Sequence, residues 1–284
     1  MHEPLLEAAL DVLDMTPRAM GRTSGGSSLP VVRVDDEDGC VYALRYGPPA
    51  AAAVLDRESR NLKAAARAKV PCPRVLRRAD SNIVSVLLTT WEAGTVLAEA
   101  FGDPSGSAAA LARQAGAAQA ALHRTGRLAL GPELDAGWAR PHSAAEEEAL
   151  SGCDDDGPPT LLHLDFHPLN LLTDGDRISC VLDWVNAGVG DHRRDVARTV
   201  SILWLDAAPK DSPLRPAICR ILDEWLEGYL EAGGELPAMR PYMVWAGLAT
   251  MRDLAGKRTR AQLAGMKEEV SLWADGGDLP GHCL

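Results

Sequence analysis

Apolar residues recur at helical spacing in some segments of the chain and alternate at strand spacing in others. In the first ninety residues, the predicted elements are a helix over 3–15, strands over 31–34 and 40–46, a helix over 51–68, and strands over 74–78 and 82–90. The turn-forming residues 35–39 separate the first two strands and predict a β-hairpin. A loop rich in glycine and serine precedes this hairpin.

The remainder of the chain has a mainly helical pattern. The predicted elements are a helix over 107–124, a short helix near 142–150, short strands within 160–183, and helices from 193 to 274 with breaks near Pro213, Gly233 and Pro237. The segment Trp91-Glu92-Ala93-Gly94 marks the crossing between the two parts. The pattern therefore predicts an α+β protein with an antiparallel-sheet part over 1–91 and a mainly helical part over 92–284.

Composition narrows the class of protein. The chain has 284 residues, of which 46% are hydrophobic and 24% charged, as is usual for a globular protein. No stretch approaches the ~20 uninterrupted apolar residues of a membrane span, and the acidic N-terminus does not resemble a signal peptide. The six cysteines are scattered without a CxxC pair. These features predict a cytoplasmic protein without a membrane partner.

Charge is distributed unevenly along the chain. The net charge is −11, which argues against nucleic acid as a partner. Residues 1–90 hold 12 basic and 11 acidic side chains, whereas residues 91–284 hold 17 and 29. The acidic second part could attract a cationic ligand, or it could be a solvated surface that keeps the protein soluble. The same two alternatives apply to the cluster Asp223, Glu224, Glu227 and Glu231.

The most informative segment is His163-Leu164-Asp165-Phe166-His167-Pro168-Leu169-Asn170, which fits the pattern HxDxxxxN. Asp183 follows thirteen residues after Asn170. Phosphoryl transfer from a nucleotide needs a carboxylate for the attacking hydroxyl, and an amide oxygen with a second carboxylate for magnesium. The catalytic loop of kinases has the same spacing between Asp and Asn. The segment thus indicates phosphoryl transfer with Mg²⁺.

Other interpretations of these residues are weaker. Asp165 could cap a turn, and His163, Asp165 and His167 could form a metal tripod of the hydrolase kind. A phosphate-binding P-loop is excluded, because no GxxxxGK segment followed by Ser or Thr is present. The loop that contains Gly26, Ser27 and Ser28 could be an ordinary turn, but its place before a hairpin favours contact with phosphates.

Taken together, the motifs resemble the aminoglycoside phosphotransferase family, the small-molecule branch of the protein-kinase-like fold. The segments that carry the resemblance are 70–76, 91–94, 163–170, 181–184, 190–191 and 195–199. The resemblance implies a bilobal protein-kinase-like fold that uses Mg²⁺ and ATP or GTP. The small antiparallel-sheet lobe would cover 1–91, and the mainly helical lobe would cover 92–284.

The resemblance also implies roles for individual residues. Asp165 corresponds to the catalytic carboxylate, and Asn170 and Asp183 correspond to magnesium ligands. The residues expected to contact the nucleotide are Gly26, Ser27 and Ser28 of the loop, Arg45 with its partner Glu58, and Thr90, Trp91 and Glu92 of the hinge. The third strand of the family usually carries Lys where this chain has Arg45, and Arg keeps the charge with a different geometry.

These observations predict a kinase that phosphorylates a hydroxyl of a small molecule. The first expectation is an aminoglycoside-like acceptor, which can be cationic. Kinases of macrolides, amino alcohols or sugars are alternatives within the family. A nucleotide-binding pseudokinase with a regulatory role is the alternative from another class, and Arg45 is the feature that supports it. The sequence indicates no oligomeric state.

Overall fold

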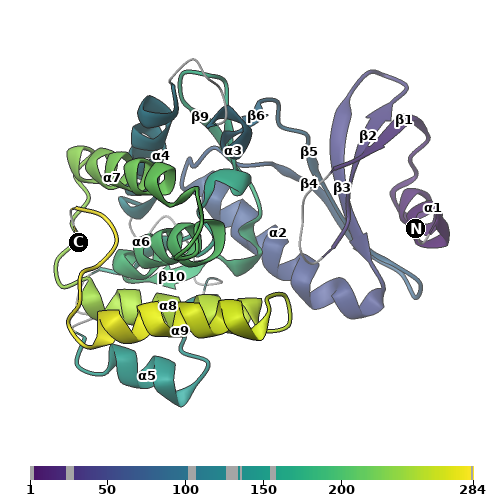
Figure 1. Ribbon diagram of the computed structural model, residues 1–284. Helices are drawn as coiled ribbons and strands as arrows, with labels where there is room; N and C mark the ends of the chain where they lie inside the picture. Colours follow the sequence, from purple (N-terminus) through teal and green to yellow (C-terminus); the bar gives the residue numbers. More distant parts are fainter. Residues whose placement is uncertain are drawn as a thin grey trace. The chain divides into compact units, whose positions relative to one another are not determined.

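The computed structural model describes residues 3–23, 29–101, 107–125, 134, 136–153, 158–282 and 284. Gly26, Ser27 and Ser28 lie outside the described residues. The chain forms two compact units, of which the first comprises Met1–Ala93 and Cys180–Val185. The second comprises Gly94–Ser179 and Asn186–Leu284. The segment that carries Asp183 therefore belongs to the first unit, although the residues before and after it in sequence belong to the second. Figure 1 labels the helices and strands of the chain.

The first unit contains a five-stranded antiparallel sheet with the strand order β1-β2-β3-β5-β4. Its elements are α1 (Glu3–Leu13), β1 (Pro17–Arg22), β2 (Val31–Asp36), β3 (Val41–Gly47), η1 (Pro49–Ala51), α2 (Ala52–Arg67), β4 (Val75–Asp80) and β5 (Ser85–Thr90). The predicted hairpin corresponds to β2 and β3, in which Val32 pairs with Leu44.

Along each strand, successive side chains point to opposite faces of this sheet. On one face, Val34, Leu44 and Val86 are fully buried and form a core with Leu6 and Leu10 of α1. Arg45 follows Leu44 in β3 and therefore points to the opposite face. There it meets α2, whose inward side includes Leu55, Glu58, Ser59, Asn61 and Leu62. The sheet thus places one charged residue of β3 beside the polar positions of α2.

The second unit is mainly helical. Its elements are β6 (Thr95–Val96), α3 (Leu97–Ala100), α4 (Ala108–His123), η3 (Gly137–Ala139), α5 (Ala144–Leu150), β7 (Thr160–Leu162), η4 (Pro168–Asn170), β8 (Leu171–Thr173), β10 (Gly188–Gly190), α6 (His192–Ser201), the π-helix η6 (Ile202–Ala207), α7 (Arg215–Glu231), α8 (Arg240–Leu254) and α9 (Arg260–Ala274). Two elements cross the division between the units, β9 (Ile178–Val181) and η5 (Trp184–Asn186). Strand β7 pairs with β10, and β8 lies between β6 and β9.

Helices α4 and α7 approach each other closely through two glycines. A Cβ atom on Gly116 would lie 1.9 Å from the carbonyl oxygen of Trp225, and one on Gly228 would lie 2.1 Å from that of Arg113. Neither position therefore has room for a side chain. The core of this unit contains large aromatic residues, and Trp225 and Trp245 are fully buried.

The sequence pattern did not separate α8 from α9. The break between them ends at Thr259, which forms a capping box with Gln262 at the start of α9. In the described part of the chain, no helix is both long and apolar enough to cross a membrane.

Candidate active site

The loop after β7 carries Asp165, and its backbone is held in an unusual conformation. Leu164 has a φ angle of +64°, which side chains with a Cβ atom rarely adopt. Leu164 is also fully buried, so water cannot satisfy its backbone groups. Such a conformation persists only where the surroundings impose it. Hydrogen bonds between the loop and α6 hold Leu164 in this conformation.

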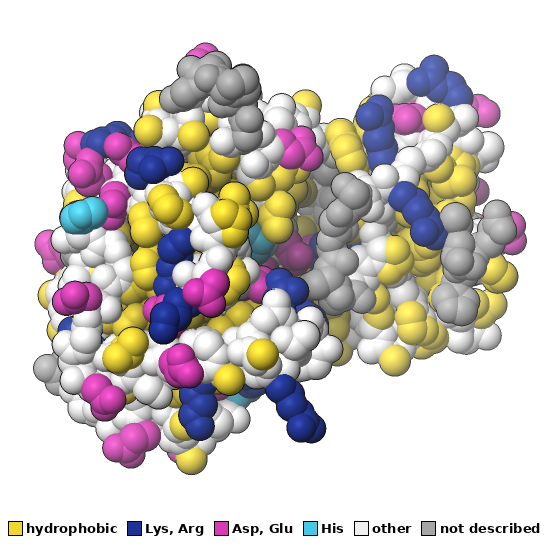
Figure 2. Space-filling model, viewed as in Figure 1, with side chains coloured by type: hydrophobic (Ala, Val, Ile, Leu, Met, Phe, Trp, Pro, Cys, Tyr) yellow, Lys and Arg dark blue, Asp and Glu magenta, His cyan; other side chains and the backbone are white. Residues whose placement is uncertain are grey.

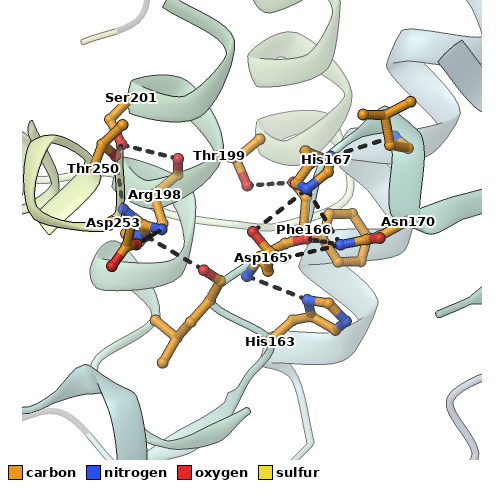
Figure 3. Close-up of polar contacts among 12 residues, drawn as sticks. His163, Asp165, Phe166, His167, Asn170, Arg198, Thr199, Ser201, Thr250 and Asp253 are labelled. Atoms are coloured by element: carbon orange, nitrogen blue, oxygen red, sulfur yellow. Dashed lines mark hydrogen bonds and ion pairs between the residues drawn. The ribbon is translucent and has the colours of Figure 1, made fainter. Parts of the chain in front are cut away.

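Three side chains of α6 bind the backbone on either side of Asp165. Figure 3 shows Arg198 and Thr199 among them. The carboxylate of Asp195 accepts a hydrogen bond from the amide of Leu164. The guanidinium Nε of Arg198 donates to the carbonyl of Leu164 at 3.3 Å. The hydroxyl of Thr199 donates to the carbonyl of Phe166 at 2.8 Å. Helix α6 therefore fixes the peptide groups that flank the candidate catalytic residue.

Asp195 is itself anchored from the opposite side. Its Oδ2 atom lies 2.9 Å from Nε2 of His123 and 3.2 Å from the side-chain amide of Gln119. The other ring nitrogen of His123 lies 2.8 Å from the hydroxyl of Tyr229. Hydrogen bonds to both oxygens offset the cost of burying this carboxylate completely, and they hold the pKa of Asp195 below its ordinary value.

Residues in the second half of the same loop contact the side chain of Asp165. The amide of Asn170 donates to Oδ2 of Asp165 at 3.1 Å and to its main-chain carbonyl at 3.0 Å. Nε2 of His167 lies 3.4 Å from Oδ1. Nδ1 of His167 accepts a hydrogen bond from the amide of Leu169, and Nε2 also lies 3.2 Å from the side-chain nitrogen of Asn170. Each carboxylate oxygen of Asp165 thus faces a nitrogen of the same loop.

These surroundings decide the charge of Asp165. Burial alone would raise the pKa of Asp165, but the hydrogen bond from His167 and the electrostatic attraction of His167, Arg198 and His163 outweigh it. The pKa is lowered to about 2. Asp165 is therefore an acceptor of hydrogen bonds at neutral pH, as a residue that receives a hydroxyl group must be.

The side chain of His163 supports the backbone of the loop. The ring is fully buried, and its Nδ1 accepts a hydrogen bond from the amide of Asp165 at 3.3 Å. It packs edge to face against Phe166. Among the residues that the structure describes, no group of three His, Cys, Asp or Glu side chains is arranged to hold a metal ion. The tripod of His163, Asp165 and His167 is thus not formed.

In the first unit, Arg45 forms ion pairs with two carboxylates, those of Glu58 and Asp183. One terminal nitrogen of its guanidinium lies 2.7 Å from Oε2 of Glu58 and 3.4 Å from Oδ1 of Asp183. Asp183 has a φ angle of +56°, and the residue after it is held by Asn61, whose amide donates to the carbonyl of Trp184 at 2.7 Å. Helix α2 therefore supports both Arg45 and the segment of Asp183.

The pKa of Glu58 is shifted upward in spite of its ion pair. Burial is the largest cause, and the charge of Asp183 adds to it, whereas Arg45 acts in the opposite direction. The result is a pKa of about 6. The pKa of Arg45 is affected first by burial, which lowers it, but the two carboxylates outweigh burial and raise it. The arrangement places one cation between two acidic groups that would otherwise repel each other.

The predicted hinge residues follow directly after the sheet. The amides of Thr90 and Trp91 donate to the carbonyls of Arg74 and Val41 at 3.0 Å and 3.3 Å. The hydroxyl of Thr90 donates to the carboxylate of Glu92. Two of the three hinge amides are therefore already engaged within the first unit.

The acidic cluster of α7 is bound by a basic residue of the protein itself. Arg113 of α4 forms ion pairs with Glu224 at 2.7 Å, Glu227 at 2.5 Å and Glu231 at 2.7 Å. Figure 2 shows acidic and basic side chains side by side over these helices. This contact favours the interpretation of the cluster as a solvated surface over a binding site for an ammonium group.

Arg198 and Thr199 received no individual role from the sequence, although both bind the backbone of the loop that carries Asp165. The available signal was the spacing of polar residues at 195, 198 and 199, which lie on one side of a helix. That pattern is also typical of a solvent-exposed helix surface, and only the fold distinguishes the two cases.

The comparison with protein families assigns the chain to a family. The sequence profile of a family described as the phosphotransferase enzyme family matches residues 21–245. The chain belongs to this family. The predicted resemblance and the prediction of an enzyme, a small-molecule kinase, are thereby confirmed. No curated protein matches the sequence.

Solved structures show that the fold is shared across the family. The aminoglycoside phosphotransferase APH(4)-Ia, in a complex with ADP and hygromycin B, is 18% identical and has a TM-score of 0.64, with 96% of this chain and 99% of that chain covered. The amicoumacin kinase hAmiN, with AMP-PNP, Ca²⁺ and amicoumacin, is 12% identical and has a TM-score of 0.64, with 98% of this chain and 96% of that chain covered.

A third structure is the macrolide 2′-phosphotransferase MphH from Brachybacterium faecium, which is 18% identical with a TM-score of 0.54 and covers 98% and 100%. At these identities the likeness concerns the fold. The predicted class, an α+β protein with a protein-kinase-like fold, is confirmed.

Proposed function

We propose that the protein transfers the γ-phosphoryl group of ATP or GTP, with Mg²⁺, to a hydroxyl of a small molecule. The observation that carries this proposal is the environment of Asp165. It is an ionised carboxylate whose two oxygens face His167 and Asn170, on a loop whose backbone is hydrogen-bonded to side chains of α6. Such a carboxylate can fix the direction of an attacking hydroxyl group, and positioning of this kind supplies most of the catalysis in phosphoryl transfer.

In the proposed reaction, the hydroxyl oxygen of the acceptor forms a bond to the γ-phosphorus while the bond to the bridging oxygen of the nucleoside diphosphate breaks. Asp165 accepts a hydrogen bond from the hydroxyl and then its proton. A pKa of about 2 makes Asp165 a weak base, so the proton leaves only once the new bond has made the hydroxyl acidic. The diphosphate leaves with the electron pair of the broken bond.

The chemistry of Asn170 and Asp183 suits the proposed metal. The amide nitrogen of Asn170 faces two acceptors of Asp165, which identifies it as the donor end and leaves the amide oxygen for another ligand. Figure 3 shows this oxygen turned away from Asp165. Asp183 supplies a carboxylate, and magnesium prefers hard oxygen ligands of these two kinds. When bound, Mg²⁺ would neutralise charge that develops on the phosphates.

The remaining predicted residues would bind the nucleotide. Arg45, which Glu58 orients, would bind phosphate oxygens, and the loop of Gly26, Ser27 and Ser28 would cover them. Thr90, Trp91 and Glu92 would contact the edge of the base. Because the amides of Thr90 and Trp91 are engaged in the sheet, we propose that the backbone of Glu92 makes the hydrogen bond to the base.

The acceptor that we propose first is aminoglycoside-like. The support is the excess of acidic residues after residue 90 and the shared fold with a structure that contains hygromycin B. The proteins related in fold also include an amicoumacin kinase and a macrolide 2′-phosphotransferase. Macrolides, amino alcohols and sugars are therefore the acceptors to compare.

The test is release of nucleoside diphosphate from Mg-ATP and Mg-GTP with pooled aminoglycosides, macrolides, amino alcohols or sugars. The expected result is release that depends on one pool and is lost in Asp165→Asn. Asp174→Asn is the control, because Asp174 is an exposed residue that accepts hydrogen bonds in a turn of the same unit. Nucleotide binding without turnover for any pool would contradict the proposal and favour a pseudokinase.

A further inference from the structure

Arg198 is a buried cation whose hydrogen-bonding groups reach two different parts of the second unit. Its side chain is 3% exposed. Nε donates to the carbonyl of Leu164 at 3.3 Å, and the two terminal nitrogens donate to Thr250 at 2.7 Å and to Asp253 at 3.0 Å on α8. Figure 3 shows this bridge between the catalytic loop and α8.

The planar guanidinium is also fixed by an aromatic ring. Its central carbon lies 4.5 Å from the centre of the Trp138 ring, and the guanidinium of Arg252 lies 4.4 Å from the same ring. Stacking and three hydrogen bonds in a plane leave the side chain little freedom of orientation. A lysine at this position could keep the charge but not the three directions of donation.

The carbonyl that Arg198 binds has a special place in the loop. It belongs to the peptide group that joins Leu164 to Asp165, and rotation of this group would turn the Asp165 side chain. Leu164 adopts a left-handed conformation, and Asp195 binds its amide while Arg198 binds its carbonyl. The two side chains come from adjacent turns of α6 and together fix both peptide groups of Leu164.

We propose that Arg198 is a positioning residue for Asp165, and that Thr250 and Asp253 make α8 the support that holds Arg198 in place. The inference rests on the proposed function, in which Asp165 receives the acceptor hydroxyl. Arg198 does not contact the reacting atoms in this account. It sets the angle of the peptide group before Asp165, and small errors in such an angle are costly in reactions that depend on positioning.

The chain provides a matched control in Arg215. This residue stacks on Trp204 with its central carbon 3.6 Å from the ring, pairs with Glu269, and donates to the carbonyls of Trp204 and Ala208. It thus combines a tryptophan, a carboxylate and backbone carbonyls as Arg198 does, but it lies at the start of α7, and these partners belong to η6, to Ala208 after it and to α9. Loss of either arginine breaks a similar set of contacts.

The experiment compares Arg198→Met, Arg198→Lys and Arg215→Met with the unmodified chain. Turnover is measured with the acceptor found in the panel, together with the melting temperature and hydrogen–deuterium exchange of the amides of residues 163–166. We expect Arg198→Met to lower kcat about 100-fold with little change in KM for the nucleotide. Exchange at residues 163–166 rises in the same variant. For Arg198→Lys, we expect kcat and exchange to lie between those of Arg198→Met and those of the unmodified chain. Arg215→Met lowers the melting temperature without affecting kcat or exchange.

Several results would overturn the inference. Equal losses of kcat in Arg198→Met and Arg215→Met would show a general effect of stability. Loss of kcat without increased exchange at residues 163–166 would show that Arg198 does not act through the loop. If Arg198→Met does not fold, Arg198→Lys and Asp253→Asn decide by the same measurements. Absence of turnover in the unmodified chain would contradict the proposed function, while the exchange comparison would still test the contact itself.

Discussion

The side-chain amide of Asn170 donates hydrogen bonds to both the carboxylate and the main-chain carbonyl of Asp165, at 3.1 Å and 3.0 Å. The residue proposed to hold the metal therefore also orients the residue proposed to receive the hydroxyl. One loop of six residues couples the two roles, because the amide nitrogen of Asn170 serves Asp165 while its oxygen remains available.

Replacement of Asn170 should therefore affect two properties together. In Asn170→Ala, we expect kcat to fall about 100-fold, because Asp165 loses an orienting donor, and the Mg²⁺ concentration for half-maximal rate to rise. The measurement is initial rate against Mg²⁺ concentration at saturating nucleotide. A variant that needs more Mg²⁺ but regains the full kcat would show that Asn170 does not orient Asp165.

Loss of Arg45 should weaken nucleotide binding. In Arg45→Met, Glu58 and Asp183 lose the cation between them, and we expect Kd for Mg-ATP to rise about tenfold. Arg45→Lys should retain most of the affinity, since the charge remains. Titration calorimetry checks both.

Arg78→Met is the control for this series, because Arg78 has the same side-chain exposure of 11% and pairs with Asp56 and Asp80 in the same unit. Equal loss of affinity in Arg45→Met and Arg78→Met would contradict a role of Arg45 at the phosphates.

The raised pKa of Glu58 gives stability a defined dependence on pH. The folded value of about 6 exceeds the ordinary value of 4.5, so the folded state binds the proton more tightly than the unfolded chain does. The free energy of unfolding therefore falls, on account of Glu58, as pH rises from 4.5 to 6. Relative to Glu58→Gln, the unmodified chain should lose roughly 2 kcal/mol across this interval.

Urea denaturation of both proteins at pH 4.5 and pH 7 measures this change. Lower stability at pH 7 than at pH 4.5, relative to Glu58→Gln, would support burial and the charge of Asp183 as the dominant influences on the pKa of Glu58. A gain in relative stability with rising pH would show that the attraction of Arg45 outweighs them, and that the pKa of Glu58 is lowered.

The contact between α4 and α7 should not tolerate a methyl group. We expect Gly116→Ala and Gly228→Ala each to destabilise the protein by about 3 kcal/mol, because the helices must separate to admit the Cβ atom. Gly265→Ala on α9 is the control, since a Cβ atom there would meet no atom within 4 Å. That variant should be stabilised by up to about 1 kcal/mol through helix propensity. Thermal denaturation would contradict the account if all three variants behaved alike.

Much of the fold follows from local patterns in the sequence. The hairpin of β2 and β3 follows from strand alternation around turn residues, and the helices follow from apolar periodicity. The start of α9 carried a readable signal as well, because Thr259 and Gln262 have the spacing of a capping box. The pairing of Arg45 with Glu58 was predicted from the resemblance to the family. The periodicity of apolar residues predicts single elements and does not predict a contact between two of them.

What could not be predicted depends on contacts between distant residues. Helix α6 has the sequence HRRDVARTVS, whose polarity is typical of an exposed helix, yet Asp195, Arg198 and Thr199 are buried. Burial is possible because their polar groups bind the backbone of the loop that carries Asp165 and side chains of α4 and α8. Similarly, the partners of Arg113 lie more than a hundred residues away in α7.

The most direct test of the account is the rate of phosphoryl transfer in a single turnover, with γ-labelled ATP and the acceptor that the panel identifies. Asp165→Asn should lower this rate by about 10³-fold, because the asparagine cannot accept the proton, while Kd for Mg-ATP stays unchanged. Asp174→Asn should transfer phosphate at the unmodified rate. Transfer by Asp165→Asn at a rate close to that of the unmodified chain would contradict the central claim.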